Sequence, residues 1–179
     1  GSFYTLLTGM PAFFGGAANS IFQLSYKKNI IALSDVLKSQ EHTLIHISND
    51  ANFSGTRDML RTFGFDKIID GNQVRPGFDK DIFEKLKLEI NEYKSNGDKF
   101  SIFVSTLDTH GPNGIYDRRF SSIFKSLNDL EYSVRVLDSL LQDFIGFLQT
   151  QHYIDNTNIF ILPDHKYMAK PNIFLDHQG

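Results

Sequence analysis

An aspartate and a histidine stand side by side at Asp164-His165, just after the apolar segment Thr157–Leu162. A carboxylate oxygen and an imidazole nitrogen are ordinary ligands of zinc, and carboxylate also suits manganese. A chain that has left a strand no longer alternates its side chains between two faces, so neighbouring side chains can converge on one ion. The pair therefore indicates a site for a divalent metal, Mn or Zn. The alternative is an aspartate that caps a turn beside a surface histidine.

A second polar segment, Asp108-Thr109-His110, follows the apolar segment Phe100–Leu107. We interpret His110 as a donor to a phosphate or sulfate oxygen, or as a general acid for a leaving group. The alternative is a turn histidine that only shapes the loop. Asp108 is assigned a supporting role, either orienting His110 or capping the loop, and Thr109 is grouped with these candidate substrate contacts.

Strands and helices that alternate along the chain are expected to position these segments. Short apolar runs rich in β-branched residues indicate buried strands, and apolar residues at helical spacing indicate amphipathic helices. The expected strands are Thr43–Ser48, Lys67–Ile69, Phe100–Leu107 and Thr157–Leu162. The expected helices are Ile30–Gln40, Ser54–Thr62, Asp79–Lys94 and a long one capped by Asn128, with a stripe at Leu130, Val134, Leu137, Leu141, Phe144 and Leu148.

This order predicts an α/β fold with a mainly parallel central sheet and helices on both faces, because parallel strands need crossover connections. Ligands of such sheets collect beyond the carboxyl ends of the strands. The segments after Phe100–Leu107 and Thr157–Leu162 are therefore expected to face one crevice. Asn49–Phe53 follows the first strand at the same edge and is a further candidate for substrate contact.

Other polar residues carry weaker signals. His46 lies within an apolar strand and is predicted to be a core residue rather than a ligand. Arg118-Arg119 follows the His110 segment and is either solvated or meets an anionic substrate. Three further histidines are predicted to face solvent: His42, His152 and His177.

The N-terminal segment Gly1–Pro11 carries hydroxyl side chains, among them Ser2 and Thr5, that could in principle act as nucleophiles. Its spacing also fits a helix that simply packs through Tyr4, Leu7 and Thr8. The packing helix is the favoured interpretation from the residues alone.

Composition narrows the class of protein. The 179 residues include 18 Lys+Arg, 21 Asp+Glu and no Cys, which gives a formal charge of −3. That balance argues against a nucleic-acid platform or a basic membrane-surface module. The absence of cysteine excludes disulfides, thiolate metal sites and a cysteine nucleophile within these residues. No apolar run approaches the roughly 20 residues of a membrane span.

Several sequence blocks together resemble the alkaline phosphatase/sulfatase superfamily, especially its bacterial phosphoglycerol transferases of periplasmic glucans and its lipoteichoic acid synthases. The blocks occur in the family's order and are Leu7–Pro11, Asn52–Asp66, Thr106–Pro112 and Asp155–His165. The resemblance implies that Asp164 and His165 bind the catalytic metal and that His110 contacts the substrate phosphate. It also implies a Thr or Ser nucleophile that carries a phospho-group and passes it to an acceptor.

The same resemblance implies that parts of the catalytic domain lie outside this chain. The family's nucleophile and first acidic metal ligand would fall before Gly1, and Ser2 and Thr5 are only weak substitutes that do not match the spacing. The family also continues beyond the Asp-His pair. We therefore expect residues 1–179 to be a single sulfatase-like domain fragment that lacks the nucleophile strand and the C-terminal part, and to be nearly inactive alone.

The function implied is a metal-dependent phosphotransferase that moves a phosphoglycerol- or phosphoethanolamine-type group to a cell-envelope glycan. The expected partners are a phospholipid-derived donor and a glycan acceptor, with no nucleic acid, and the parent protein is expected to be membrane-anchored. The expected location is the periplasm or the outer face of a bacterial cell membrane. The alternatives are a sulfatase, a phosphodiesterase, or a degenerate domain with only a binding role.

Overall fold

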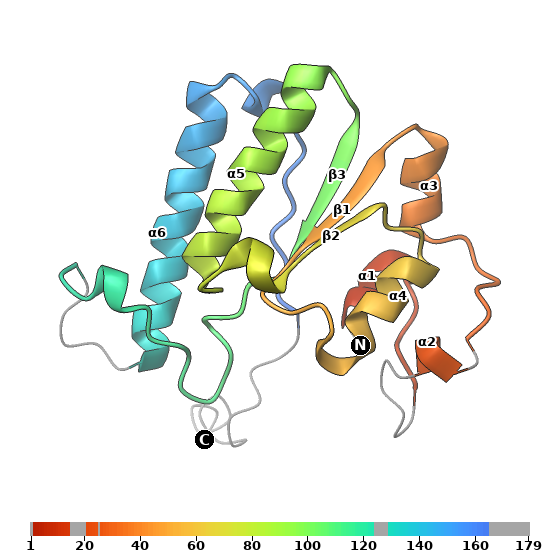
Figure 1. Ribbon diagram of the computed structural model, residues 1–179, viewed down its shortest axis with the longest axis horizontal. Helices are drawn as coiled ribbons and strands as arrows, with labels where there is room; N and C mark the ends of the chain where they lie inside the picture. The colour runs from red at the N-terminus through yellow and green to blue at the C-terminus, as the bar shows by residue number, and fades with distance from the viewer. Residues whose placement is uncertain (1, 15–20, 25, 124–128, 165–179) are drawn as a thin grey trace, which may run out of the picture. The chain divides into compact units, whose positions relative to one another are not determined.

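The structure, a computed structural model, describes residues 2–14, 21–24, 26–123 and 129–164 (Figure 1). Contacts along the chain divide it into two compact units, Gly1–Thr106 and Leu107–Gly179.

The first unit contains a three-stranded parallel sheet. Its strands are β1 (Thr43–Ile47), β2 (Lys67–Ile69) and β3 (Phe100–Val104), in the order β2-β1-β3. In the register, Ile45 of β1 lies opposite Lys67 of β2 and Ile102 of β3. All three strands were predicted within a few residues, and their parallel pairing confirms the predicted α/β class.

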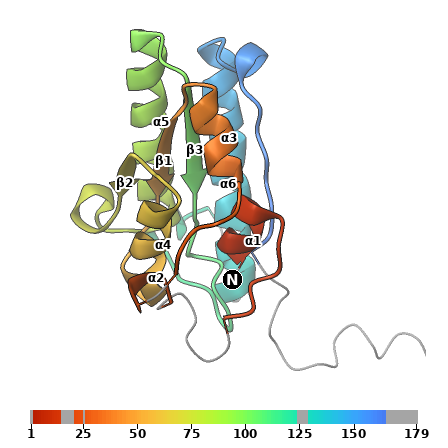
Figure 2. The ribbon, with the colours of Figure 1, turned by 90° about the vertical axis from the view of Figure 1, so that its right-hand side faces the viewer.

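Helices cover both faces of this sheet, as predicted (Figures 1 and 2). Helix α5 (Asp79–Asn96) lies on one face, and α1 (Ser2–Thr8), α3 (Leu33–Ser39) and α4 (Thr56–Thr62) lie on the other. The unit also contains α2 (Ile21–Leu24) and two 3₁₀ turns, η2 (Phe53–Gly55) and η3 (Gly71–Val74). Side chains alternate along a strand. Leu44 accordingly joins the apolar cluster with Leu7 of α1 and Leu60 of α4.

Helix α5 is capped at both ends. The carboxylate of Asp81 accepts hydrogen bonds from the amides of Gly77 (3.2 Å) and Phe78 (3.0 Å), which satisfies donors at the start of the helix. Gly97 ends the helix in a left-handed conformation, with φ of 75°. The buried apolar side chains of α5 recur at helical spacing and are Ile82, Phe83, Leu86 and Ile90.

The second unit is built on α6 (Asp129–Thr150), with the 3₁₀ turns η4 (Arg118–Phe120) and η5 (Ile154–Asn156). The buried apolar positions of α6 step by four residues and are Tyr132, Val136, Leu140, Phe144 and Leu148. The predicted stripe is therefore correct at Phe144 and Leu148 and wrong at Val134, which is 50% exposed. The expected cap, Asn128, lies outside the described residues. Over the described ranges, no helix combines the length and apolar character that a bilayer span requires.

The predicted strand Thr157–Leu162 is irregular in the structure. The side chains of Phe160, Ile161 and Leu162 are exposed, and Phe160 retains 82% of its accessible surface. A strand exists only where a neighbouring strand takes up its backbone hydrogen bonds, and within the described residues this segment has no such neighbour. Composition alone therefore gave a wrong prediction here.

Candidate functional site

The segment that carries His110 forms a compact loop in the second unit. The amide of His110 donates to the carbonyl of Leu107 (2.8 Å), and the carbonyl of His110 accepts from the amide of Gly114 (3.0 Å). The amide of Ile115 closes the loop by donating to the carbonyl of Asp108 at 2.7 Å. His110 therefore lies at the tip of a loop that its own backbone holds in shape.

Helix α6 anchors the far side of this loop. The hydroxyl of Ser133 donates to the carbonyl of Ile115 (2.9 Å), and the hydroxyl of Tyr132 donates to the carbonyl of Asp117 (2.6 Å). The rings of Tyr116 and Tyr132 are stacked with centroids 4.2 Å apart. Because Tyr132 and Ser133 are both buried, these contacts fix the loop to the first turn of the helix.

The side chain of His110 is exposed, and its ring is oriented by a contact from Nδ1 to the carbonyl oxygen of Gly111 at 2.8 Å. A carbonyl can only accept a hydrogen bond, so Nδ1 carries a proton. In the neutral ring Nε2 then has a lone pair, and only the imidazolium form can donate from Nε2. The function expected for His110, donation to an anionic oxygen, therefore requires the charged form.

Asp108 is buried, with 1% of its surface exposed. Its backbone carbonyl accepts a hydrogen bond from the amide of Ile115. Nδ1 of His110 lies 2.8 Å from the carbonyl oxygen of Gly111. Both supporting roles expected for the Asp108 side chain stay predictions. Thr109 is half-buried between Asp108 and His110.

Of the predicted metal ligands, the structure describes Asp164, whose side chain is exposed at the surface. His165 lies outside the described residues, as does His177. Among the residues that are described, three or more His, Cys, Asp or Glu side chains do not gather in any place where they could hold a metal ion. The roles of Asp164 and His165 therefore remain predictions.

The N-terminal segment forms α1, and Tyr4 and Leu7 are buried as the favoured interpretation predicted. Thr5 is exposed and Ser2 half-buried on this helix. The hydroxyl of Thr8 donates back to the carbonyl of Tyr4 at 2.8 Å. This packing supports a structural role for the helix, and the use of Ser2 or Thr5 as a nucleophile stays untested.

At the carboxyl ends of β1 and β2 lies an ion pair that the sequence reasoning missed. Arg57 Nη2 contacts both carboxylate oxygens of Asp70, at 2.7 and 2.6 Å, and Arg57 Nε donates to Asn52 Oδ1 at 2.7 Å. The amide of Ala51 also donates to Asp70 Oδ2 at 2.8 Å. Asp70 directly follows β2, so the strand-end rule that selected Asp108 would also have found it.

His46 is a core residue, as predicted, with 1% exposure. Its Nε2 lies 3.3 Å from Ser105 Oγ, and within the described part of the chain its Nδ1 has no hydrogen-bond partner. Burial lowers the pKa of His46 to about 4; Asp70 partly opposes this shift, and Arg57 adds to it. The ring is therefore neutral near pH 7.

The remaining candidates have mixed outcomes. Both nitrogens Nε and Nη2 of Arg119 bind the carboxylate of Asp117, so this arginine is committed to a structural pair, whereas Arg118 is exposed. His152 is exposed as predicted. The prediction was wrong for His42, which is half-buried and contacts Ser101 Oγ at 2.8 Å.

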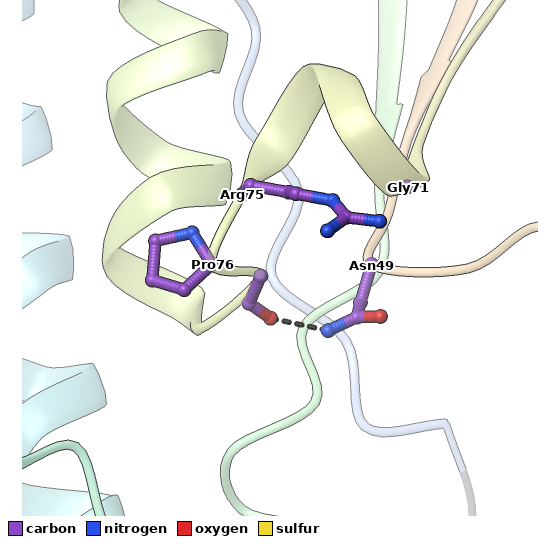
Figure 3. Close-up of a pocket in the computed structure, with 5 residues that line it drawn as sticks. Asn49, Gly71, Arg75 and Pro76 are labelled. Carbon is purple, nitrogen blue, oxygen red and sulfur yellow. Dashed lines mark hydrogen bonds between the residues drawn. The ribbon is translucent and has the colours of Figure 1, made fainter.

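A cavity of about 520 Å³ opens where the segments after β1 and β2 meet (Figure 3). Its lining consists of Asn49, Gly71, Arg75, Pro76 and Gly77. Asn49 belongs to the segment expected to contact a substrate, and the carboxyl edge of the sheet is where that expectation placed it. Arg75 gave no signal in the sequence, because neither strand ends at it.

The chain is similar in sequence to known proteins. The sequence model of the Sulfatase family matches residues 2–179. Phosphoglycerol transferase I of Citrobacter koseri and that of Escherichia fergusonii are each 25% identical to the chain over 179 residues. The alignments cover 89% of this chain and 23% of each relative. The chain thus spans about a quarter of the length of these curated relatives.

Solved structures share the fold. The lipoteichoic acid synthase LtaP from Listeria monocytogenes superposes with a TM-score of 0.70 at 19% identity, over 84% of this chain and 40% of that one. A protein in the alkaline phosphatase superfamily from Vibrio parahaemolyticus superposes with a TM-score of 0.61 at 22% identity, over 83% and 38%. At these identities the superpositions show similarity of fold.

Proposed function

The chain belongs to the sulfatase family, and from this premise we propose that it is part of a metal-dependent phosphotransferase acting on the cell envelope. The group transferred is of the phosphoglycerol or phosphoethanolamine type, the donor derives from a phospholipid, and the acceptor is a glycan. The proposed place of action is the periplasm or the outer face of the bacterial membrane. The observation that carries the proposal is the match of 89% of the chain to proteins named phosphoglycerol transferase I.

The geometry of the His110 loop supports this proposal. An exposed ring whose Nδ1 is held by a carbonyl presents Nε2 to the solvent side of the loop. In the imidazolium form, Nε2 would donate to a phosphate oxygen or protonate a departing oxygen. The hydrogen bonds from Tyr132 and Ser133 keep the loop in place without a contribution from the ring, so the ring can bind substrate without disturbing the loop.

The donor set at the end of the described chain suits a divalent metal. Asp164 supplies a surface carboxylate, and its neighbour His165 supplies an imidazole nitrogen, a combination that Zn and Mn accept. Together they would provide two ligands of a coordination shell. When bound, such an ion polarises the phosphoryl group and favours attack by a hydroxyl.

The first experiment measures metal binding directly. We expect Mn²⁺ or Zn²⁺ to bind the full-length protein in calorimetric titrations and the Asp164→Ala, His165→Ala double variant to lose at least about tenfold in affinity, because each ligand contributes directly to the coordination. Asp155→Ala, which changes an exposed aspartate in η5, is the matched control. Equal metal affinity in the double variant and the wild type would exclude this pair as the metal site.

The second experiment measures transfer. The full-length protein is incubated with metal, vesicles of phosphatidylglycerol and an oligosaccharide acceptor, and phosphoglycerol transfer is followed by mass spectrometry. We expect His110→Ala to lower the rate about 10²- to 10⁴-fold, the usual contribution of a positioned acid or donor. His152→Asn, which changes another exposed histidine, serves as the control and should retain the wild-type rate.

The same assay separates the alternatives. Release of glycerol phosphate into water without transfer would identify a phosphodiesterase, and hydrolysis of an aryl sulfate instead would identify a sulfatase. Absence of turnover by the full-length protein, with metal present, would favour a domain with only a binding role. Each of these results would contradict the proposed transfer.

A further inference from the structure

We propose that residues 6–36 present a lipid-binding surface, whose exposed apolar side chains insert into the interface of an anionic membrane. The surface lies within the first unit, on the face of the sheet that α1 and α3 cover (Figures 1 and 2). The inference goes beyond the proposed transfer reaction, because it concerns neither the metal ligands nor His110 and does not depend on turnover. It describes contact with one leaflet rather than a membrane span.

Large apolar side chains are concentrated at the surface of this part of the chain. Of the fourteen large apolar side chains that are exposed among the described residues, six lie between positions 6 and 36. These six are Leu6, Met10, Phe13, Ile31, Leu33 and Val36. Single exposed apolar residues are ordinary, but a concentration of them indicates a surface that binds an apolar partner.

The core fixes the outward direction of the two most exposed of these side chains. Phe13 is 89% exposed, whereas the residues before and after it pack against the apolar core cluster of the unit. Ile31 is 83% exposed, and it too lies between two residues that pack against that cluster. Neither Phe13 nor Ile31 can therefore turn inward without pulling its neighbours out of the core.

Helix α3 contributes two further apolar side chains. Leu33 and Val36 are both exposed and lie one helical turn apart, so they occupy the same side of the helix. Leu37, on another side of α3, packs against the core cluster. Helix α1 contacts α3 and carries the exposed Leu6. The exposed apolar side chains therefore extend over two contacting helices and the segments that adjoin them.

Charged side chains are sparse in the same part of the chain. Of the 18 Lys+Arg and 21 Asp+Glu residues of the protein, only Lys27, Lys28 and Asp35 lie within positions 1–36. The carboxylate of Asp35 pairs with Lys28 and also accepts from the amide of Ala32 at 2.8 Å. Lys27 is exposed, and over the described ranges it has no ion-pair partner. Positions 1–36 therefore carry a net charge of +1, which leaves −4 of the total of −3 for the other residues.

These two properties together fit an anionic lipid surface. Apolar side chains gain free energy on entering the acyl boundary, and a free lysine is attracted to anionic headgroups. The other residues, with their charge of −4, are repelled by the same headgroups, so the chain approaches the membrane through this segment. Side chains that project singly suit a fluid lipid surface, which adapts to their shape, whereas a protein partner would need a pocket for each. The contact is mainly apolar, so it does not require the basic composition that the chain lacks.

Fluorescent labels at single positions test this contact. Phe13→Cys and Ile31→Cys each provide one thiol for a polarity-sensitive fluorophore, since residues 1–179 contain no cysteine, and any cysteine elsewhere in the full-length protein is replaced by serine. The labelled full-length protein is reconstituted with vesicles of phosphatidylglycerol and phosphatidylethanolamine that include lipid carrying a spin-label quencher near the headgroup. We expect the emission of both labels to shift to the blue and to be quenched by the spin-labelled lipid.

Leu88→Cys is the matched control, because Leu88 is exposed on α5, on the opposite face of the sheet, and its label should not respond to lipid. Lys27→Gln, combined with the label at position 31, tests the charge. It should lower the equilibrium constant for contact, obtained from the quenched fraction, about fivefold on these vesicles, and should have no effect on vesicles of phosphatidylcholine.

A lack of quenching by lipid at positions 13 and 31 would overturn the proposal, as would equal quenching at position 88. Labels that are blue-shifted without lipid and stay unquenched when it is added would show that another part of the protein or a second copy covers the surface, which also overturns it. Unchanged contact of Lys27→Gln with the anionic vesicles would overturn the role of Lys27. The fluorescence does not depend on turnover, so this proposal and the transfer reaction can fail separately.

Discussion

His46 shows how burial changes the acid-base behaviour of a single residue. The sequence placed this histidine in the core, and the structure adds the consequence, a pKa lowered to about 4 by burial. An unfolded chain would take up a proton near the ordinary value of 6.5. The unfolded state therefore binds more protons than the folded state between these two values.

We expect this difference to appear in the stability of the protein. As pH falls from about 6.5 towards 4, protonation of the unfolded state should lower the free energy of unfolding by up to roughly 3 kcal/mol. His46→Leu should remove this part of the pH dependence, because leucine does not titrate. The measurement is urea unfolding of both proteins at several pH values across this range.

His42→Gln is the control for this measurement, since it removes a histidine that is only half-buried. The carboxylates of Asp35, Asp66 and Glu89, whose pKa values are lowered, contribute equally to both proteins. The difference between His46→Leu and wild type therefore isolates His46. If His46→Leu and the wild type lost stability in parallel on acidification, the assigned pKa of His46 would be wrong.

At the scale of elements, an ionic contact ties β2 to α5. Glu89 of α5 is buried, and its carboxylate accepts from Lys67 of β2 at 2.6 Å and from Lys85 at 2.9 Å. Removal of one partner from a buried ion pair leaves the other charge poorly solvated, which costs more than the pair contributes. This contact should therefore be sensitive to neutralisation of Glu89.

We expect Glu89→Gln to lower the free energy of unfolding by about 1 to 3 kcal/mol, because the amide cannot satisfy two ammonium groups. Glu84→Gln is the matched control, since Glu84 is an exposed residue of the same helix that pairs with Lys80. Its change should stay within about 0.5 kcal/mol. Urea unfolding of both variants gives the comparison, and similar stabilities would show that the β2–α5 contact contributes little.

The elements also show which sequence patterns were sufficient to predict secondary structure. The strands β1, β2 and β3 were predictable because each apolar run has a paired neighbour in the sheet. The segment Thr157–Leu162 is similarly apolar but irregular, because a strand depends on a neighbouring strand and composition does not reveal one. In α6, helical spacing correctly predicted a helix, but several apolar stripes were possible and the choice that included Val134 was wrong.

At the scale of the whole molecule, the sequence identified the fold class and the loop of His110 but not the contacts that complete the sites. The strand-end rule located Asp108, His110 and Asn49, since chain order alone places such residues. The partners were not predictable in the same way. The carbonyl of Gly111 that orients His110 and the guanidinium of Arg75 beside Asn49 depend on how loops fold back in space.

The close contact between Gly77 and Asn49, whose side-chain nitrogen donates to the carbonyl of Gly77, also limits how this part of the protein can change during evolution. A side chain at position 77 would displace the amide of Asn49, and with it the bond that joins the two loops. A substitution at position 77 therefore meets both this contact and a backbone conformation that L side chains rarely adopt. Among sequences that keep Asn49 and these loops, position 77 should remain glycine, although 28 positions separate the two residues.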